Sequence, residues 1–178
     1  TKMKVFTWKG ERDTIMSPTD SIRYYKHFLQ SGVMAMEPQT GHIKAWVGGI
    51  NYKYFQYDHV GQGARQVGST FKPFVYATAI EQLGASPCDT IIDGPFMIRK
   101  GRHHVTEDWE PRNSDQRYRG MVSLKKALAN SINTVSAKLI DRVGPEAVVE
   151  LTHKLGVQSE IPVQPSIALG AVDITVHD

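Results

Sequence analysis

The clearest hydrophobic pattern in the chain is helical and lies between residues 69 and 83. Its apolar residues occur on nearly every side of a helix, which is typical of a helix buried in a core. They are Phe74, Val75, Ala77, Ala79, Ile80 and Leu83. Pro73 places the helix start close to Ser69, because proline is tolerated only near a helix start, and Gly84 is a favourable end. The pattern therefore predicts a buried helix with a serine hydroxyl at its open end.

Weaker patterns predict helices and strands on both sides of this helix. Before it, we expect a strand within residues 3–8, a helix over 21–30, and a hairpin of strands 33–36 and 43–47. The core-facing stripe of the 21–30 helix should consist of Ile22, Tyr25, Phe28 and Leu29.

The second half of the chain alternates irregular and helical patterns. Pro and Gly punctuate residues 85–119, where short strands are expected at 90–92 and 96–98. Two helices should then meet at a polar corner near residues 130–133, and a further helix should cover 145–155. This mixture of helices and short strands favours an α+β fold.

Composition and charge exclude several function classes. The 178 residues are 40% hydrophobic and 22% charged, which suits one globular domain or part of one. A net charge of +3, without a block of like charges, gives no reason to expect a nucleic-acid partner. The single cysteine, Cys88, excludes an internal disulfide and a cysteine-based zinc site.

Ser69 and Lys72 form the first candidate chemical motif. They are three residues apart, so on a helix they lie on one face and can touch. A serine hydroxyl is a weak nucleophile until a base takes its proton. Lysine can act as that base only where burial and the helix dipole lower its pKa from about 10.4. The same spacing recurs at Ser123 and Lys126, where the serine is better explained as a helix cap.

Ser131 and Asn133 form the second candidate motif, Ser-Ile-Asn at residues 131–133. They interrupt a helical pattern with residues that prefer caps and turns. A simple helix cap explains this triplet, taken alone, as well as an exposed functional corner does.

Two adjacent histidines, His103 and His104, lie near acidic residues and raise the question of a metal site. Adjacent side chains on a strand point in opposite directions, so the pair would make poor joint ligands, and we expect no metal there. The residues expected to anchor this region to the body near the active cleft are Trp109, Pro111, Asn113 and Tyr118.

The combination of GSTFKP at residues 68–73 with SIN at 131–133 resembles the transpeptidase domain of penicillin-binding proteins. Residues 32–49 resemble the opening hairpin of such domains. The sequence of these segments is most similar to that of class A, bifunctional high-molecular-mass enzymes. The resemblance implies a serine β-lactamase-like α+β fold with a helical subdomain and an incomplete antiparallel sheet. It also implies a linker region at 1–20 and a partial transpeptidase domain at 21–178.

The third motif of the family, Lys-Thr-Gly or Lys-Ser-Gly, does not occur in these residues. In the family it lies on a core strand well after the second motif, so we expect it beyond Asp178, in a longer parent protein. The chain would then be the N-terminal part of the domain and, by itself, acylate very slowly or not at all. A missing core strand leaves sheet edges unpaired, so the fragment is expected either to pair with another copy or to be poorly stable.

The resemblance implies a peptidoglycan D,D-transpeptidase that uses no cofactor. Ser69 would attack the stem peptide and Lys72 would accept its proton. Ser131 would relay a proton to the leaving amine, and Asn133 would hold the substrate amide. β-Lactams would acylate Ser69 covalently. The parent is expected to carry a glycosyltransferase domain and a membrane anchor, and to work at the periplasmic or extracytoplasmic face of a bacterial cytoplasmic membrane.

Other functions remain open at this point. A class A β-lactamase or a D,D-carboxypeptidase shares both motifs but ends in hydrolysis, although the 32–49 hairpin and the N-terminal region argue against a β-lactamase. A non-catalytic β-lactam sensor would acylate without cross-linking. A pseudo-enzyme would act only as a scaffold for wall-synthesis proteins, and labelling with a fluorescent penicillin would separate it from the others.

Overall fold

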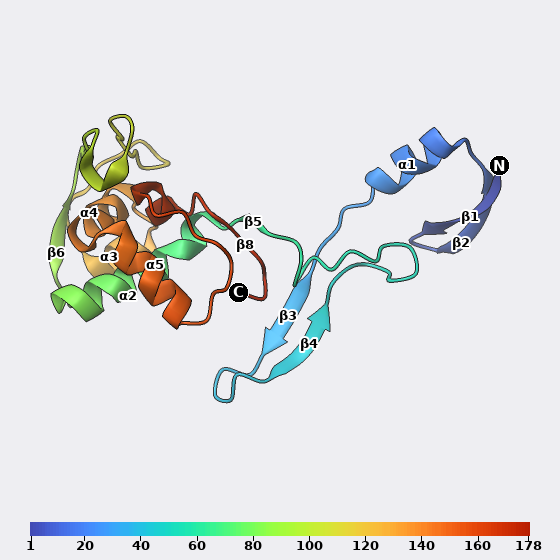
Figure 1. Cartoon of the computed structure of the whole chain (residues 1–178), viewed down its shortest axis with the longest axis horizontal. Helices are drawn as coiled ribbons and strands as arrows, with labels where there is room; N and C mark the ends of the chain where they lie inside the picture. Colours follow the sequence, from blue (N-terminus) through green and yellow to red (C-terminus); the bar gives the residue numbers. More distant parts are fainter. The chain divides into compact units, whose positions relative to one another are not determined.

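The computed structural model describes every residue of the chain, Thr1–Asp178. It contains two compact units: the first comprises residues 1–64 with 175–177, and the second comprises residues 65–174 with 178. Their helices and strands are labelled in Figure 1. None of the helices combines the length and the apolar character that crossing a membrane requires.

The first unit begins with a hairpin and a helix. Strands β1 (Lys2–Thr7) and β2 (Gly10–Ile15) pair antiparallel over their full length. Helix α1 (Pro18–Lys26) follows, and the Ser17 hydroxyl caps its N-terminus. The strand expected within 3–8 is therefore present as β1. Strand β2 was not expected, because its residues are mostly charged and exposed and show no alternation.

The aromatic core of this unit is centred on Phe6. Its ring centroid lies 5.2–5.9 Å from those of Trp8, Phe28, Tyr54 and Phe55. Rings at these spacings are favourable contacts in addition to the apolar area that they bury.

The expectation for α1 is only half right. The helix begins and ends earlier than 21–30, and Ile22 and Leu29 are 59% and 88% exposed. Tyr25 and Phe28 do pack in the aromatic core. Tyr24 takes the place expected for Ile22, because its hydroxyl donates to the Phe6 carbonyl at 2.7 Å.

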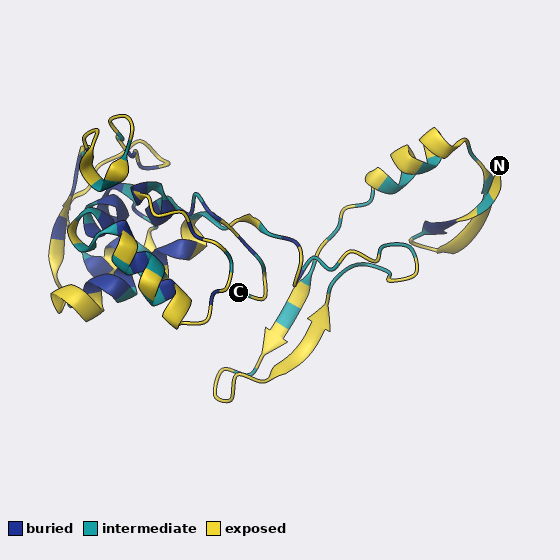
Figure 2. Cartoon of the chain, viewed as in Figure 1, coloured by how far each residue is buried: buried dark blue, intermediate teal, exposed yellow.

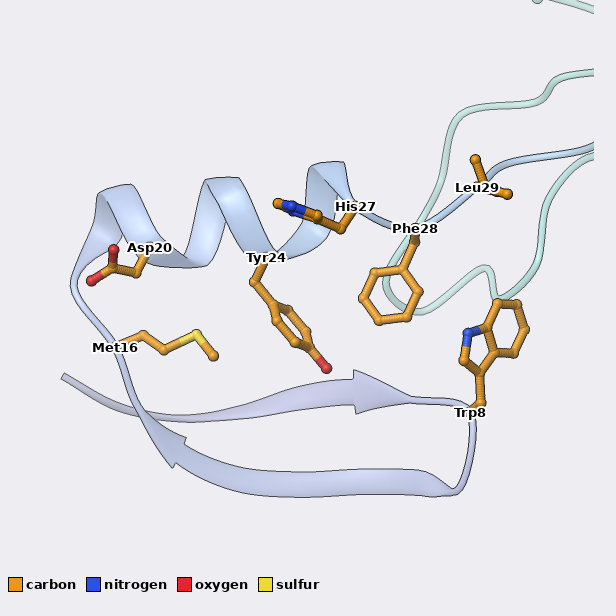
Figure 3. Close-up of a pocket in the computed structure, with 7 residues that line it drawn as sticks. All are labelled: Trp8, Met16, Asp20, Tyr24, His27, Phe28 and Leu29. Atoms are coloured by element: carbon orange, nitrogen blue, oxygen red, sulfur yellow. The ribbon is translucent and has the colours of Figure 1, made fainter.

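A pocket of about 630 Å³ lies between the β1–β2 hairpin and α1, and Figure 3 shows the side chains that surround it. It is lined by Trp8, Met16, Asp20, Tyr24, His27, Phe28 and Leu29. The lining is largely apolar and includes no serine, lysine or cysteine. The pocket therefore does not contain the chemistry that the two motifs predict.

Strands β3 (Val33–Met36) and β4 (Ile43–Val47) form the hairpin that the sequence predicts, with the expected bounds. Most residues of this ribbon are exposed, as its yellow colour in Figure 2 shows. Its Trp46 indole donates to an Asp58 carboxylate oxygen at 2.9 Å, which ties β4 to the loop that follows.

The second unit is built around four helices, α2 (Lys72–Leu83), α3 (Leu124–Ala129), α4 (Asn133–Val143) and α5 (Pro145–Lys154). The buried residues in Figure 2 concentrate along their inner faces. The fully buried apolar residues of these helices are Val75, Ala79, Ala127, Val135, Ala137, Ile140 and Val148. These residues belong to the core that packs the four helices against one another.

Short strands and 3-10 turns complete the second unit. They are β5 (Arg65–Gln66), η1 (Gly68–Phe71), β6 (Thr90–Asp93), η2 (Arg102–His104), β7 (Gly120–Ser123), η3 (Pro165–Leu169) and β8 (Asp173–Ile174). Strand β5 pairs with β8, and β6 pairs with β7. Every sheet of the chain is a two-stranded antiparallel pair.

Two local expectations in this unit need correction. Helix α2 begins at Lys72, because Ser69 lies in the preceding 3-10 turn, η1. The strand expected at 90–92 is β6, whereas residues 96–98 contribute only an isolated bridge from Ile98 to Trp109.

Two glycines bring separate segments of the second unit into contact. The Gly68 N–H donates to the Gly170 carbonyl at 3.2 Å and extends the β5–β8 pairing. A Cβ atom on Gly170 would lie 1.8 Å from the Gly68 oxygen, and Gly170 has φ +75. Only glycine fits here, so Gly170 fixes the backbone that leads into Ser69.

Candidate active site

Ser69 is exposed to solvent at the entrance to α2. The η1 turn holds the residue, and Gly68 with φ +57 allows the chain to enter this turn. Ser69 Oγ accepts a hydrogen bond from Ser131 Oγ at 2.9 Å. The two motifs found in the sequence, which are 62 residues apart, therefore meet in the structure.

Lys72 reaches the same point from the first residue of α2. Only 1% of the residue is exposed. Its Nζ donates to the Ser131 carbonyl at 2.6 Å, to Ser131 Oγ at 2.9 Å and to Asn133 Oδ1 at 2.7 Å. All three acceptors are neutral oxygens, so no carboxylate offsets the loss of water around the ammonium. Burial accordingly lowers the pKa of Lys72 to about 8.

Ser131 lies between the other two groups because of an unusual backbone conformation. Its φ is +53, and such a left-handed residue other than glycine costs about 1–3 kcal/mol. Backbone hydrogen bonds of the corner between α3 and α4 hold it, including one from its own N–H to the Leu128 carbonyl at 2.9 Å. The direct contact that the spacing of Ser69 and Lys72 predicted is replaced by a link through Ser131 Oγ.

Asn133 is the first residue of α4, and both ends of its amide are held. Its Oδ1 accepts from Lys72, and its Nδ2 donates to the Arg112 carbonyl at 2.8 Å. Its backbone N–H donates to Asn113 Oδ1 at 3.0 Å. The structure thus brings all four predicted site residues into one hydrogen-bonded cluster. Two of them, Ser69 and Lys72, come from the entrance of α2, and the other two come from the corner before α4.

A buried carboxylate that no sequence pattern predicted lies behind this cluster. Asp93 ends β6, and its side chain is fully buried. It accepts hydrogen bonds from Thr134 Oγ1 at 2.6 Å and from Asn113 Nδ2 at 2.8 Å. A lone acid at the end of an apolar strand was the only signal in the sequence. Asn113 was expected only to anchor its region near the cleft.

Two other candidate positions have different surroundings. Ser123 Oγ accepts from the Lys126 N–H at 3.2 Å as the N-cap of α3, which confirms the cap interpretation. His103 Nε2 lies 3.1 Å from Asp141 Oδ1, in the η2 turn rather than on a strand. No three His, Cys, Asp or Glu side chains are grouped as metal ligands would be.

Two family models match the chain. The penicillin binding protein transpeptidase domain matches residues 31–167, which include the whole cluster. The penicillin-binding protein middle domain matches residues 1–29. The boundary at residue 20 that the resemblance implied stays a prediction.

Named relatives agree with these matches. The chain is 36% identical to penicillin-binding protein 1A of Neisseria flavescens over 168 residues, 94% of this chain and 20% of that protein. It is 39% identical to penicillin-binding protein 1A of Aquifex aeolicus over 150 residues, 83% of this chain and 20% of that protein. The chain therefore spans about a fifth of the length of the curated relatives it matches.

Solved structures share the fold. The crystal structure of penicillin-binding protein 1A from Haemophilus influenzae matches with a TM-score of 0.74 and 31% identity, over 82% of this chain and 21% of that chain. PonA1 from Mycobacterium tuberculosis, in complex with penicillin V, matches with a TM-score of 0.69 and 23% identity, over 90% of this chain and 45% of that chain. The expected partial penicillin-binding fold of α+β type is confirmed, and the chain belongs to the penicillin-binding protein transpeptidase family.

Proposed function

We propose that this chain is the acylating part of a peptidoglycan D,D-transpeptidase. The observation that carries the proposal is the link from buried Lys72 Nζ to Ser131 Oγ and on to the exposed Ser69 Oγ. It joins an accessible nucleophile to an amine whose pKa burial has lowered to about 8, as activation of a serine requires. The peptidoglycan substrate places the reaction on the periplasmic or extracytoplasmic side, in a parent with a membrane anchor and a glycosyltransferase domain.

In the proposed reaction, Ser69 Oγ attacks the carbonyl of the penultimate D-alanine of a stem peptide. Its proton passes to Ser131 Oγ while Ser131 gives its own proton to neutral Lys72. The tetrahedral adduct then collapses, the carbon–nitrogen bond breaks, and the leaving amine of D-alanine takes the proton back through Ser131. An amine of a neighbouring strand next attacks the acyl-serine ester, which forms the cross-link and restores the Ser69 hydroxyl.

Asn133 has two roles in this proposal. Its Oδ1 accepts a hydrogen bond from Lys72, which keeps Nζ beside Ser131. Its Nδ2 and Oδ1 each keep one further hydrogen-bonding position beside these contacts, and with these positions the side chain would hold the amide of the substrate. A β-lactam carries the same kind of reactive carbonyl and would form a stable ester with Ser69.

The test is incubation of the parent protein with a stem peptide ending in D-alanyl-D-alanine and a free amine acceptor. A cross-linked amide product, detected by mass spectrometry, is the expected result. Release of D-alanine with only the hydrolysed acid would make the protein a D,D-carboxypeptidase. Labelling by fluorescent penicillin without turnover would make it a sensor, and the absence of both would leave the scaffold function.

The lowered pKa of Lys72 predicts a pH dependence of acylation. Only the neutral amine accepts a proton, and below a pKa of about 8 the neutral fraction grows with pH. Acylation by a β-lactam should therefore rise roughly fiftyfold between pH 6 and pH 8 and level off above pH 9. Stopped-flow rates of the parent across this range provide the measurement. A flat profile would contradict the role of Lys72 as the base.

A second prediction concerns Gly170, whose replacement by alanine should slow acylation at least about a hundredfold. The new Cβ would meet the Gly68 carbonyl and displace the backbone that leads into Ser69. The matched control is Gly156→Ala, because Gly156 also has a positive φ, +110, but open space where its Cβ would lie. Penicillin-labelling rates of the two variants give the comparison. Equal losses would show that backbone strain alone, and not the contact, is responsible.

A further inference from the structure

The fully buried carboxylate of Asp93 joins three separate segments of the second unit. Its Oδ1 accepts from Thr134 in α4 and from Asn113, and its Oδ2 accepts from the Arg119 N–H at 2.9 Å. Burial raises the pKa of Asp93, but these hydrogen bonds outweigh that effect and hold the pKa below its ordinary value. Asp93 is therefore ionised at neutral pH, and the mechanism given above makes no use of it.

Asn113 connects Asp93 to the start of α4. The first N–H groups of a helix have no partner within the helix and need a capping acceptor. Helix α4 receives no cap from Ile132, the residue in front of it. Asn113 Oδ1, twenty residues earlier in the chain, accepts instead from the N–H groups of Asn133 at 3.0 Å and Thr134 at 3.2 Å.

The capped residue Asn133 contacts Lys72 alongside Ser131. Asn113 holds its backbone, and the carbonyl of the neighbouring Arg112 accepts from its Nδ2. Because the backbone and Nδ2 of Asn133 are both held, its Oδ1 points at Lys72 Nζ. Asp93 in turn fixes Asn113 by accepting from its Nδ2. The contacts form one continuous path from Asp93 to Lys72.

We propose that Asp93 and Asn113 are positioning residues that act on acylation through Asn133, by keeping its amide in place to hold Lys72 Nζ against Ser131. The proposal rests on the proposed function. An ion pair with the Arg119 side chain does not account for Asp93. Arg119 NH1 lies 3.6 Å from Asp93, whereas its NH2 pairs with the exposed Asp115 at 2.6 Å. Asn113 and Thr134 give Asp93 closer contacts than this side chain does.

A double-mutant cycle on the parent protein tests the path, with the rate of acylation by a β-lactam as the readout. Asp93→Asn should slow acylation at least about tenfold, because an amide can no longer accept from all three donors. Asn133→Ala should slow it as well. In the Asn133→Ala background, Asp93→Asn should add less than about a twofold loss, since its effect passes through the side chain that is already absent. The matched control Asp115→Asn, which removes a carboxylate that shares Arg119, should stay within about twofold of the parent.

Multiplicative losses in the cycle would overturn the proposal, because they would show that Asp93 acts independently of Asn133. Should Asp93→Asn fail to fold in a thermal-unfolding measurement, Asn113→Ala takes its place in the same cycle, with Asn130→Ala as its exposed control. Failure of both variants to fold would make the network purely structural and would also overturn the proposal. A parent that is not acylated at all would instead reject the proposed function.

Discussion

Replacement of Ser69 by alanine in the parent protein should abolish labelling by a fluorescent penicillin. Ser69 carries the only hydroxyl that is both exposed at the helix entrance and hydrogen-bonded to Ser131, which links it to Lys72. Without its oxygen no acyl-enzyme ester can form, so the loss should be complete rather than partial. The measurement is the fluorescence of the protein band after a saturating incubation.

The matched control for this variant is Ser123→Ala, which removes the serine of the second Ser-x-x-Lys pattern. Ser123 caps α3 and has no contact with the cluster, so its variant should label at the rate of the parent. Helix capping by serine is worth about 0.5–2 kcal/mol, and the thermal midpoint of this variant should fall slightly. Full labelling of Ser69→Ala would show that another residue is the nucleophile.

Replacement of Lys72 by arginine should reduce the acylation rate at least roughly a hundredfold, about as far as Lys72→Ala. Arginine keeps the positive charge but cannot be deprotonated near neutrality. The pKa of about 8 makes the native amine a usable base, and this property is the one that arginine lacks. Stopped-flow acylation of both variants at pH 8 gives the comparison.

Lys138→Arg is the matched control, because Lys138 is a partly buried lysine whose pKa is also lowered by burial. Its Nζ donates to the Ile92 carbonyl at 2.7 Å, outside the cluster, so this variant should acylate at nearly the parental rate. Near-parental acylation by Lys72→Arg would show that the site requires a positive charge and not a proton acceptor.

Local sequence patterns predicted the elements that depend on local signals. The β3–β4 hairpin, the cap at Ser123 and the glycine end of α2 follow from turn residues, caps and apolar spacing within a few positions. The β1–β2 hairpin did not follow, because the exposed strand β2 contains no apolar alternation. The face of α1 was predicted only in part, because Tyr24 packs through a hydrogen bond to Phe6 of that hairpin.

The site was predicted as a set of residues but not as an arrangement. The two motifs indicated Ser69, Lys72, Ser131 and Asn133, which the structure brings together. The bridging place of Ser131 depends on a positive φ that serine rarely adopts, so apolar spacing gave no sign of it. Asp93 and Asn113 form these hydrogen bonds with partners 20 to 41 residues away. Contacts over such separations produce no periodic pattern in the sequence.

The most direct test of the central claim is to locate the adduct after the parent protein reacts with a β-lactam. Trypsin, which does not cleave before Pro73, places Ser69 in the peptide 66–99, whereas Ser123 lies in 120–125 and Ser131 in 127–138. We predict one adduct per molecule, in peptide 66–99, with fragment ions assigning it to Ser69. An adduct in either of the other two peptides, or an unmodified 66–99 peptide from labelled protein, would contradict Ser69 as the nucleophile.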